Sequence, residues 1–99
     1  MTIINSKEEF YEQIKKEKIL VDFYADWCGP CKILSQILEE IENKLNIPII
    51  KVNTDAFMSI AREYKIQSIP ALKIFSNGKV IKEKVGLMSK EELEDFVNN

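Results

Sequence analysis

The two cysteines are the residues whose type and spacing most clearly indicate chemistry. Cys28 and Cys31 lie in the hexapeptide WCGPCK, after an apolar run and at the start of a helical pattern. At a helix N-terminus, free backbone N–H groups and the positive end of the helix dipole stabilise a thiolate. The spacing therefore predicts a redox pair, with Cys28 as an exposed nucleophile and Cys31 as a shielded resolving thiol. The alternative is a pair of core cysteines near a helix start, which the strand–CxxC–helix context disfavours.

The composition excludes several other kinds of site. The sequence holds no histidine, which excludes Ser-His-Asp and Cys-His catalysis and His-ligated metals or haem. Two cysteines cannot supply a four-cysteine zinc or iron–sulfur site within one chain. The 14 Lys and Arg residues against 16 Asp and Glu give a net charge of −2, without a basic excess. We therefore expect no bound metal, no nucleic acid and no membrane partner.

Length and hydrophobic content indicate one folded domain. With 99 residues, 45% of them hydrophobic, the chain has room for a single domain, residues 1–99. Met1–Ser6 lacks the basic start and apolar run of a secretory signal, and no apolar stretch reaches transmembrane length. These features predict a cytoplasmic protein, with a processed mature form as the alternative.

Hydrophobic patterns predict the elements that position the cysteines. Thr2–Asn5 has the pattern of a short strand, and Ser6–Glu9 forms a capping box for a helix that ends near Lys16. The apolar run Ile19–Tyr24 is typical of a central parallel strand. A 3.6-residue apolar period then predicts a helix from about Cys28 to Asn43.

The second half of the chain predicts a hairpin and a last helix. Asn77-Gly78 between two strand-like runs favours a hairpin, because both central residues of a type I′ turn need positive φ. A second capping box, Ser89–Glu92, begins the last helix. The other expected elements are a strand over Pro48–Asn53, a helix over 56–64, and strands over Ala71–Phe75 and Val80–Val85. The order β-α-β-α-β-α-β-β-α predicts an α/β fold with a mixed sheet and helices on both faces.

Four segments, VDFYADWCGPCK, KVNTD, SIPALKIFSNGKV and KVGLMSK, resemble the thioredoxin family in order and spacing. The resemblance covers nearly the whole chain, and its WCGPC core is highly specific. It implies the thioredoxin fold and a dithiol–disulfide exchange that reduces protein disulfides. It further implies a monomer without a bound cofactor, which receives electrons from NADPH through a thioredoxin reductase. Its expected partners are that reductase and disulfide-containing substrate proteins such as reductases and peroxidases.

The resemblance also implies roles for single residues. Cys28 matches the attacking thiolate, and Cys31 matches the thiol that resolves the mixed disulfide. Asp22 matches a buried carboxylate that takes a proton from the resolving thiol, and Lys51 matches a lysine near that carboxylate. Independently of the resemblance, apolar neighbours on both sides predict that Asp22 is desolvated, which raises a carboxyl pKa. The alternatives are a strand-end Asp22 and a solvated strand lysine at Lys51.

A second group of matched positions concerns substrate binding. Pro70 matches the cis-proline that faces the cysteine pair, where Ile69 and Pro70 offer backbone to an extended substrate. Trp27, Ile69 and Gly86 match the apolar rim of the site, and Trp27 as a plain core residue is the alternative. The remaining candidates, Gly29 and Pro30, allow the tight turn between the cysteines.

Several positions depart from the family pattern. Gln36 stands where a helix-kinking proline is common, so we expect a straighter helix there. Ser68 and Ala71 adjoin the substrate strip and differ from the common Gly and Thr. Phe57 and Met58 replace positions that are usually polar or proline, and they either pack into the core or form an exposed patch.

Two other functions share the expected fold. Disulfide oxidases and isomerases usually carry a histidine between the two cysteines, and this chain has none. Scaffold subunits form a non-enzymatic class, some of which bridge a metal with two CxxC pairs across a dimer. Pro30 disfavours that bridging because it constrains the loop.

Overall fold

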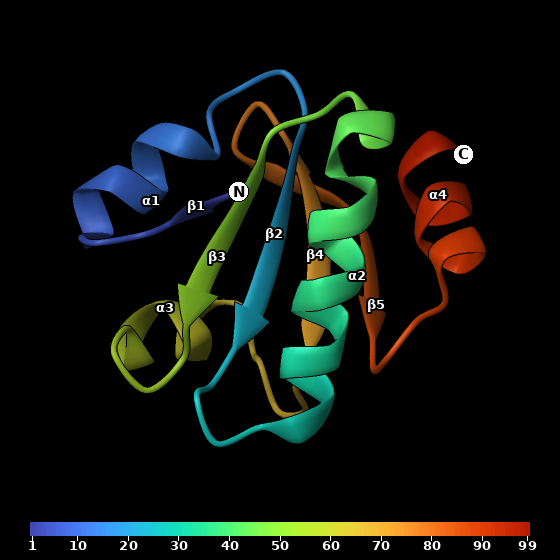
Figure 1. Ribbon diagram of the computed structural model, residues 1–99. Coiled ribbons are helices and arrows are strands. Elements are labelled where there is room, and N and C mark those ends of the chain that lie inside the picture. The colour runs from blue at the N-terminus through green and yellow to red at the C-terminus, as the bar shows by residue number, and fades with distance from the viewer.

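The computed structural model describes residues 1–99. Nine elements form one five-stranded mixed sheet with four helices around it, in the strand order β1-β3-β2-β4-β5 (Figure 1). This element order and the mixed sheet confirm the predicted α/β fold. The bounds are β1 Thr2–Ile3, α1 Lys7–Gln13, β2 Ile19–Tyr24, α2 Gly29–Leu45, β3 Ile49–Asn53, α3 Met58–Glu63, β4 Ala71–Ser76, β5 Lys79–Val85 and α4 Lys90–Asn98.

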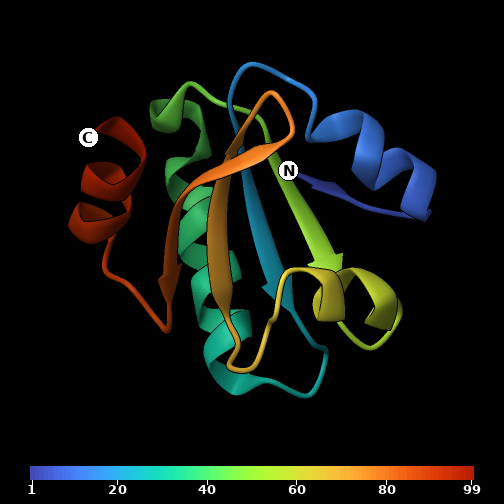
Figure 2. The ribbon, with the colours of Figure 1, turned by 180° about the vertical axis from the view of Figure 1, so that it is seen from behind.

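Strand β2 lies at the centre of the sheet, as its apolar sequence predicts. It pairs in parallel with β3 and antiparallel with β4. Helices α2 and α4 cover one face of the sheet, and α1 and α3 cover the other (Figures 1 and 2). Because both faces of β2 are covered, its side chains are apolar without alternation. Asp22 is the exception, and it is fully buried.

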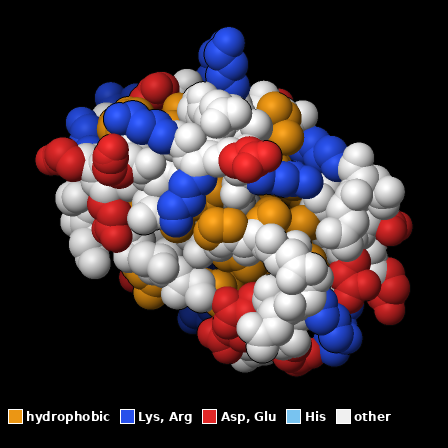
Figure 3. All heavy atoms as spheres, turned by 90° about the horizontal axis from the view of Figure 1, so that it is seen from above, with side chains coloured by type: hydrophobic (Ala, Val, Ile, Leu, Met, Phe, Trp, Pro, Cys, Tyr) orange, Lys and Arg blue, Asp and Glu red, His pale blue; other side chains and the backbone are white.

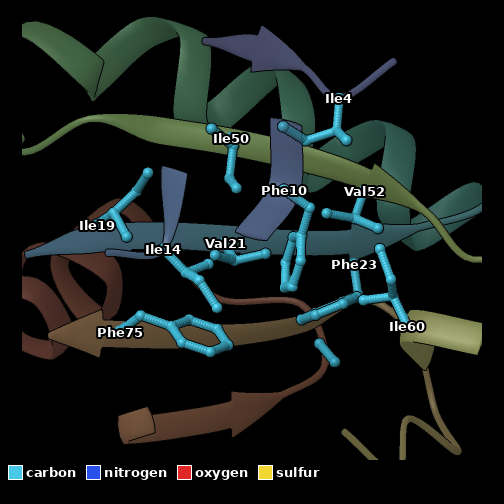
Figure 4. Packing of buried hydrophobic residues seen from close by; sticks show 11 residues of the cluster. Ile4, Phe10, Ile14, Ile19, Val21, Phe23, Ile50, Val52, Ile60 and Phe75 are labelled. Carbon is cyan, nitrogen blue, oxygen red and sulfur yellow. The ribbon is translucent and has the colours of Figure 1, made fainter. Parts of the chain in front are cut away.

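Each face of the sheet has its own hydrophobic core. On the face of α1 and α3, Phe10 packs against Phe23 and Phe75 (Figure 4). It also packs against Tyr64, and the three ring centroids lie 5.8 to 6.5 Å from that of Phe10. On the other face, the apolar stripe of α2 packs against Leu20 and against residues of β4 and α4. The two cores hold β2 between them and so fix the position of the strand end that leads to the cysteines.

The expected hairpin and helix caps form, with one difference. Asn77 and Gly78 have φ values of 52° and 87°, which confirms the predicted turn between β4 and β5. The capping box at Ser89 is complete. At Ser6 only half of it forms, because the Glu9 carboxylate accepts the N–H of Asn5 instead of that of Ser6.

Three helices have other bounds than predicted. Helix α3 covers only Met58–Glu63 of the expected range 56–64. Helix α1 ends at Gln13, three residues before Lys16. Helix α2 begins at Gly29, with Cys28 as its N-cap, and continues past Asn43 to Leu45. Leu45 extends the buried stripe of α2, so its packing stabilises the last turn. The apolar pattern used to predict the helix did not include Leu45. Asn46 then ends the helix in a left-handed conformation. The straightness expected at Gln36 stays a prediction.

Figure 3 looks onto the end of the molecule opposite the cysteine pair. Lys and Glu or Asp side chains alternate there around a small hydrophobic area, so neither sign of charge dominates that end. None of the four helices is both long enough and apolar enough to cross a membrane.

The end of α3 offers a stability prediction. Lys65 follows this helix with a φ of 55°, and the N–H groups of Lys65 and Ile66 bond the carbonyls of Arg62 and Ala61 as in a Schellman motif. A residue with a side chain costs about 1–2 kcal/mol in this left-handed backbone conformation. Glycine has no such steric cost, although it loses more conformational entropy on folding. We expect Lys65→Gly to raise the free energy of unfolding by about 0.5–1 kcal/mol in urea titrations. The matched variant Lys44→Gly, in the last helical turn of α2, should lose stability, and an equal loss at Lys65 would contradict the argument.

Candidate active site

The cysteine pair lies where strand β2 ends and helix α2 begins (Figure 1). Residues 25–27 form a short turn, closed by the N–H of Cys28 bonding the carbonyl of Ala25. Pro30 lies in the first turn of α2, where its missing N–H has no helical partner. A buried strand and a packed helix therefore hold the motif at the carboxyl edge of the sheet, where α/β proteins place their sites.

Cys28 and Cys31 are joined in a disulfide, with their Cα atoms 5.2 Å apart. The Cys28 Sγ atom also accepts the backbone N–H of Cys31 at 3.2 Å, as the side chain of a helix N-cap does. An N–H group of the first helical turn thus points at the Cys28 sulfur. The predicted electrostatic support for a thiolate at this position is in place.

The expected contrast in exposure between the two cysteines is wrong for this disulfide form. Cys28 is only 4% exposed and Cys31 is 2% exposed. The reason is local packing, because Ala25, Tyr24 and Ile69 surround the pair. What distinguishes the two residues is hydrogen bonding: Cys28 accepts the helix N–H and also lies 3.9 Å from the carbonyl oxygen of Ile69.

Asp22 is a buried acid in the strand that leads to the cysteine pair. It is 0% exposed, and neither carboxyl oxygen has a hydrogen-bond partner. Burial raises the pKa of Asp22 to about 7, against a smaller opposing effect of the Lys51 charge. The residue lies within β2, between Lys51 of β3 and Leu72 of β4, so the strand-end alternative is wrong.

Lys51 is half-buried and does not point into open solvent. Its Nζ atom donates to the Ser35 hydroxyl at 2.7 Å and lies 4.5 Å from the ring centroid of Tyr24. The alternative of a solvated strand lysine is therefore wrong. Sequence reasoning missed Ser35, although its place four residues after Cys31 puts it on the same helix face.

A cavity of about 440 Å³ opens beside the resolving cysteine. Its walls combine apolar surface with two lysines and one carboxylate. The lining residues are Tyr24, Ala25, Asp26, Cys31, Lys32, Ser35, Gln36 and Lys51.

The other edge of the site is built from backbone. The Ile69–Pro70 peptide bond is cis, as the resemblance implies. Gly86 donates its N–H to the Pro70 carbonyl at 2.8 Å and has a φ of 100°, which favours glycine. Ile69 contacts the cysteine pair, while Gly29 and Pro30 are exposed in front of it.

Trp27 forms an exposed rim, so the plain-core alternative is wrong. Its side chain is 71% exposed, and its indole N–H donates to Asp55 Oδ2 at 2.9 Å. Asp55 was not predicted, since nothing in its spacing links it to Trp27.

Each of the two alternatives for Phe57 and Met58 holds for one residue. Phe57 packs against the core on the face of α1 and α3, and Met58 is 58% exposed. No cluster of three or more Cys, Asp or Glu side chains is placed to hold a metal.

Comparison with known proteins agrees with this geometry. The family model described as Thioredoxin matches residues 1–99. The chain is 46% identical over 85 residues to a thioredoxin of Buchnera aphidicola, covering 84% of this chain and 78% of the relative. It is 39% identical over 99 residues to a thioredoxin of Mycoplasmoides gallisepticum, covering 98% and 99%. The structure of Plasmodium falciparum thioredoxin superposes with a TM-score of 0.92 at 30% identity, covering 99% and 97%. The chain therefore belongs to the thioredoxin family of disulfide oxidoreductases, with Cys28 and Cys31 as its redox-active pair.

Proposed function

We propose that the protein is a general reductant of protein disulfides. In its reduced form, the Cys28 thiolate attacks one sulfur of a substrate disulfide and releases the other as a thiolate. Cys31 then loses its proton and attacks Cys28 Sγ, which frees the second substrate sulfur and forms the Cys28–Cys31 disulfide. Two electrons pass to the substrate, and its two thiolates take up protons. The observation that carries this proposal is the helix N–H directed at the Cys28 sulfur, because it favours Cys28 as the attacking thiolate.

Asp22 is the proposed proton acceptor for Cys31. A carboxyl with a pKa of about 7 exchanges protons at neutral pH, whereas an ordinary carboxyl is fully ionised there and is a weaker base. Its burial and its lack of hydrogen-bond partners support this role. Lys51 acts on Asp22 through its charge, which favours the ionised carboxylate.

The substrate-binding strip combines backbone and apolar groups. Ile69 and the cis-proline Pro70 present backbone beside Cys28, which suits an extended segment added as a short strand. Gly86 keeps one side of the strip open because it has no side chain. The exposed ring of Trp27 supplies an apolar surface on the other side. Gly29 and Pro30 complete the strip in front of the disulfide.

The proposed cellular setting follows the family. The protein would act in the cytoplasm as a single-domain monomer, carrying electrons from NADPH by way of a thioredoxin reductase. Its substrates would be disulfide-containing proteins such as reductases and peroxidases. It would hold no cofactor of its own.

Insulin reduction with NADPH and a thioredoxin reductase tests the function. We expect NADPH oxidation to follow insulin disulfide cleavage, unchanged by a chelator, and to disappear in the matched variant Cys28→Ala. A scaffold would give no turnover although both thiols titrate, and a metal-bridging dimer would respond to the chelator. The reduction potential of the pair is the second measurement: an oxidising value would contradict the direction proposed here.

A further inference from the structure

The cation nearest to Asp22 in the sheet does not pair with it. Asp22 and Lys51 are directly opposite each other in the parallel strands β2 and β3, so their side chains lie on the same face. It is the face of helix α2, because Leu20 and Ile49, two residues earlier in each strand, pack with the residues of α2. Yet both Asp22 oxygens lack a partner. The Lys51 ammonium instead donates to Ser35 of α2 and lies over the Tyr24 ring. Two contacts thus hold the ammonium at the cavity wall, although a buried carboxyl is its neighbour.

We propose that Ser35 is a positioning residue which, with the Tyr24 ring, holds the Lys51 ammonium at the cavity and away from the Asp22 carboxylate. This inference rests on the proposed role of Asp22 as a proton acceptor. Inside a protein, an ammonium that reaches a carboxylate stabilises the ionised form strongly, because little water screens the pair. Asp22 would then be a carboxylate of low proton affinity and a poor base for Cys31. By engaging Lys51, Ser35 preserves the proton affinity of Asp22 at neutral pH.

No other charged group near Asp22 acts on its carboxyl as Lys51 does. Strand β4 presents the apolar Leu72 to Asp22. On helix α2, Cys31 is held in the disulfide, and Ser35 carries no charge. The remaining titratable groups are Asp26 and Lys32, at the cavity wall, and the Tyr24 hydroxyl. Among the charged groups, it is Lys51 that lowers the pKa of Asp22. Lys84, in register with Leu72 on β5, is engaged by Glu92.

Ser35→Ala tests the inference in the disulfide form, where no thiol titrates. Alanine is the better helix former, so the variant should fold. We expect the titration midpoint of the Asp22 carboxyl, followed by carbon-13 NMR, to fall by about one pH unit or more as Lys51 turns toward the carboxylate. Ser35→Thr keeps the hydroxyl and should restore the midpoint. The neighbouring variant Gln36→Ala lines the same cavity without contacting Lys51, so it should leave the midpoint unchanged.

A second readout is the pH profile of the resolving step, measured from a mixed disulfide on Cys28. In Ser35→Ala its midpoint should move in the same direction as the NMR midpoint. An Asp22 midpoint that stays in place or rises in Ser35→Ala overturns the positioning role, even if Asp22→Asn slows the reaction. If Asp22→Asn leaves the resolving rate unchanged, the proton-acceptor role fails instead, while the NMR midpoint still decides where Lys51 is held.

Discussion

Replacing Cys31 with serine should convert the protein into a trap for its substrates. Cys28 would still attack a substrate disulfide, but no second thiol could resolve the mixed disulfide, so turnover should stop after one equivalent. Cys28→Ser should trap almost nothing, because the Cys31 sulfur lacks the bond from a helix N–H that Cys28 receives and that favours a thiolate. Both variants remove the same disulfide, so each is the matched control of the other.

Non-reducing gels and mass spectrometry of the two variants, mixed with an excess of a disulfide-containing protein, measure the difference. The expected product is one covalent adduct per Cys31→Ser molecule, which dithiothreitol releases. Iodoacetamide should modify Cys28 faster than Cys31 in the reduced wild-type protein, because a thiolate and not a thiol reacts. Equal trapping by the two variants would show that the assignment of the attacking and resolving roles is wrong.

The fold was predictable because local signals agree with the tertiary structure. The apolar run of β2, the stripe of α2 and the Asn77-Gly78 turn each specify their element without distant contacts. Element ends were less predictable. Helix α2 extends to Leu45 because that side chain packs into the core, which is a property of the whole fold and not of the local sequence.

In the site, too, some features were predictable from the local sequence and others were not. The redox pair and the burial of Asp22 follow from residue type and local context. The cis bond at Pro70 needed the family resemblance, since most X–Pro bonds are trans. The contacts of Lys51 with Ser35 and of Trp27 with Asp55 join segments far apart in the chain. Such contacts depend on how side chains orient after the sheet has formed, and no spacing rule encodes them.

Asp22→Asn should stabilise the protein at alkaline pH and slow its chemistry. The folded-state pKa of Asp22, about 7, is higher than the ordinary carboxyl value of 3.8. Below pH 3.8 the acid is protonated in both the folded and unfolded states and costs nothing extra. As the pH rises toward 7, the unfolded chain releases its proton while the folded protein keeps it, so stability falls. Above pH 7 both states are ionised and the loss is complete.

The size of this loss follows from the pKa difference. Each pKa unit corresponds to about 1.4 kcal/mol, so the wild-type protein should lose about 4 kcal/mol in all, of which about 2–3 kcal/mol falls between pH 5 and pH 8. Asparagine keeps the shape and cannot ionise, so the variant should not show this loss. Urea unfolding of the disulfide forms at pH 5 and pH 8 measures it without interference from the thiols.

The rate of the same variant tells whether Asp22 is a proton acceptor in the reaction or only a buried carboxyl. Without a proton acceptor beside Cys31, attack on the mixed disulfide should slow at pH 7, although the folded protein has become more stable. Lys51 is held by the Ser35 hydroxyl and the Tyr24 ring, so it does not take the place of the lost base. A stabilised variant with a wild-type resolving rate would show that Asp22 is only a destabilising buried acid. A variant with unchanged stability at both pH values would contradict the raised pKa itself.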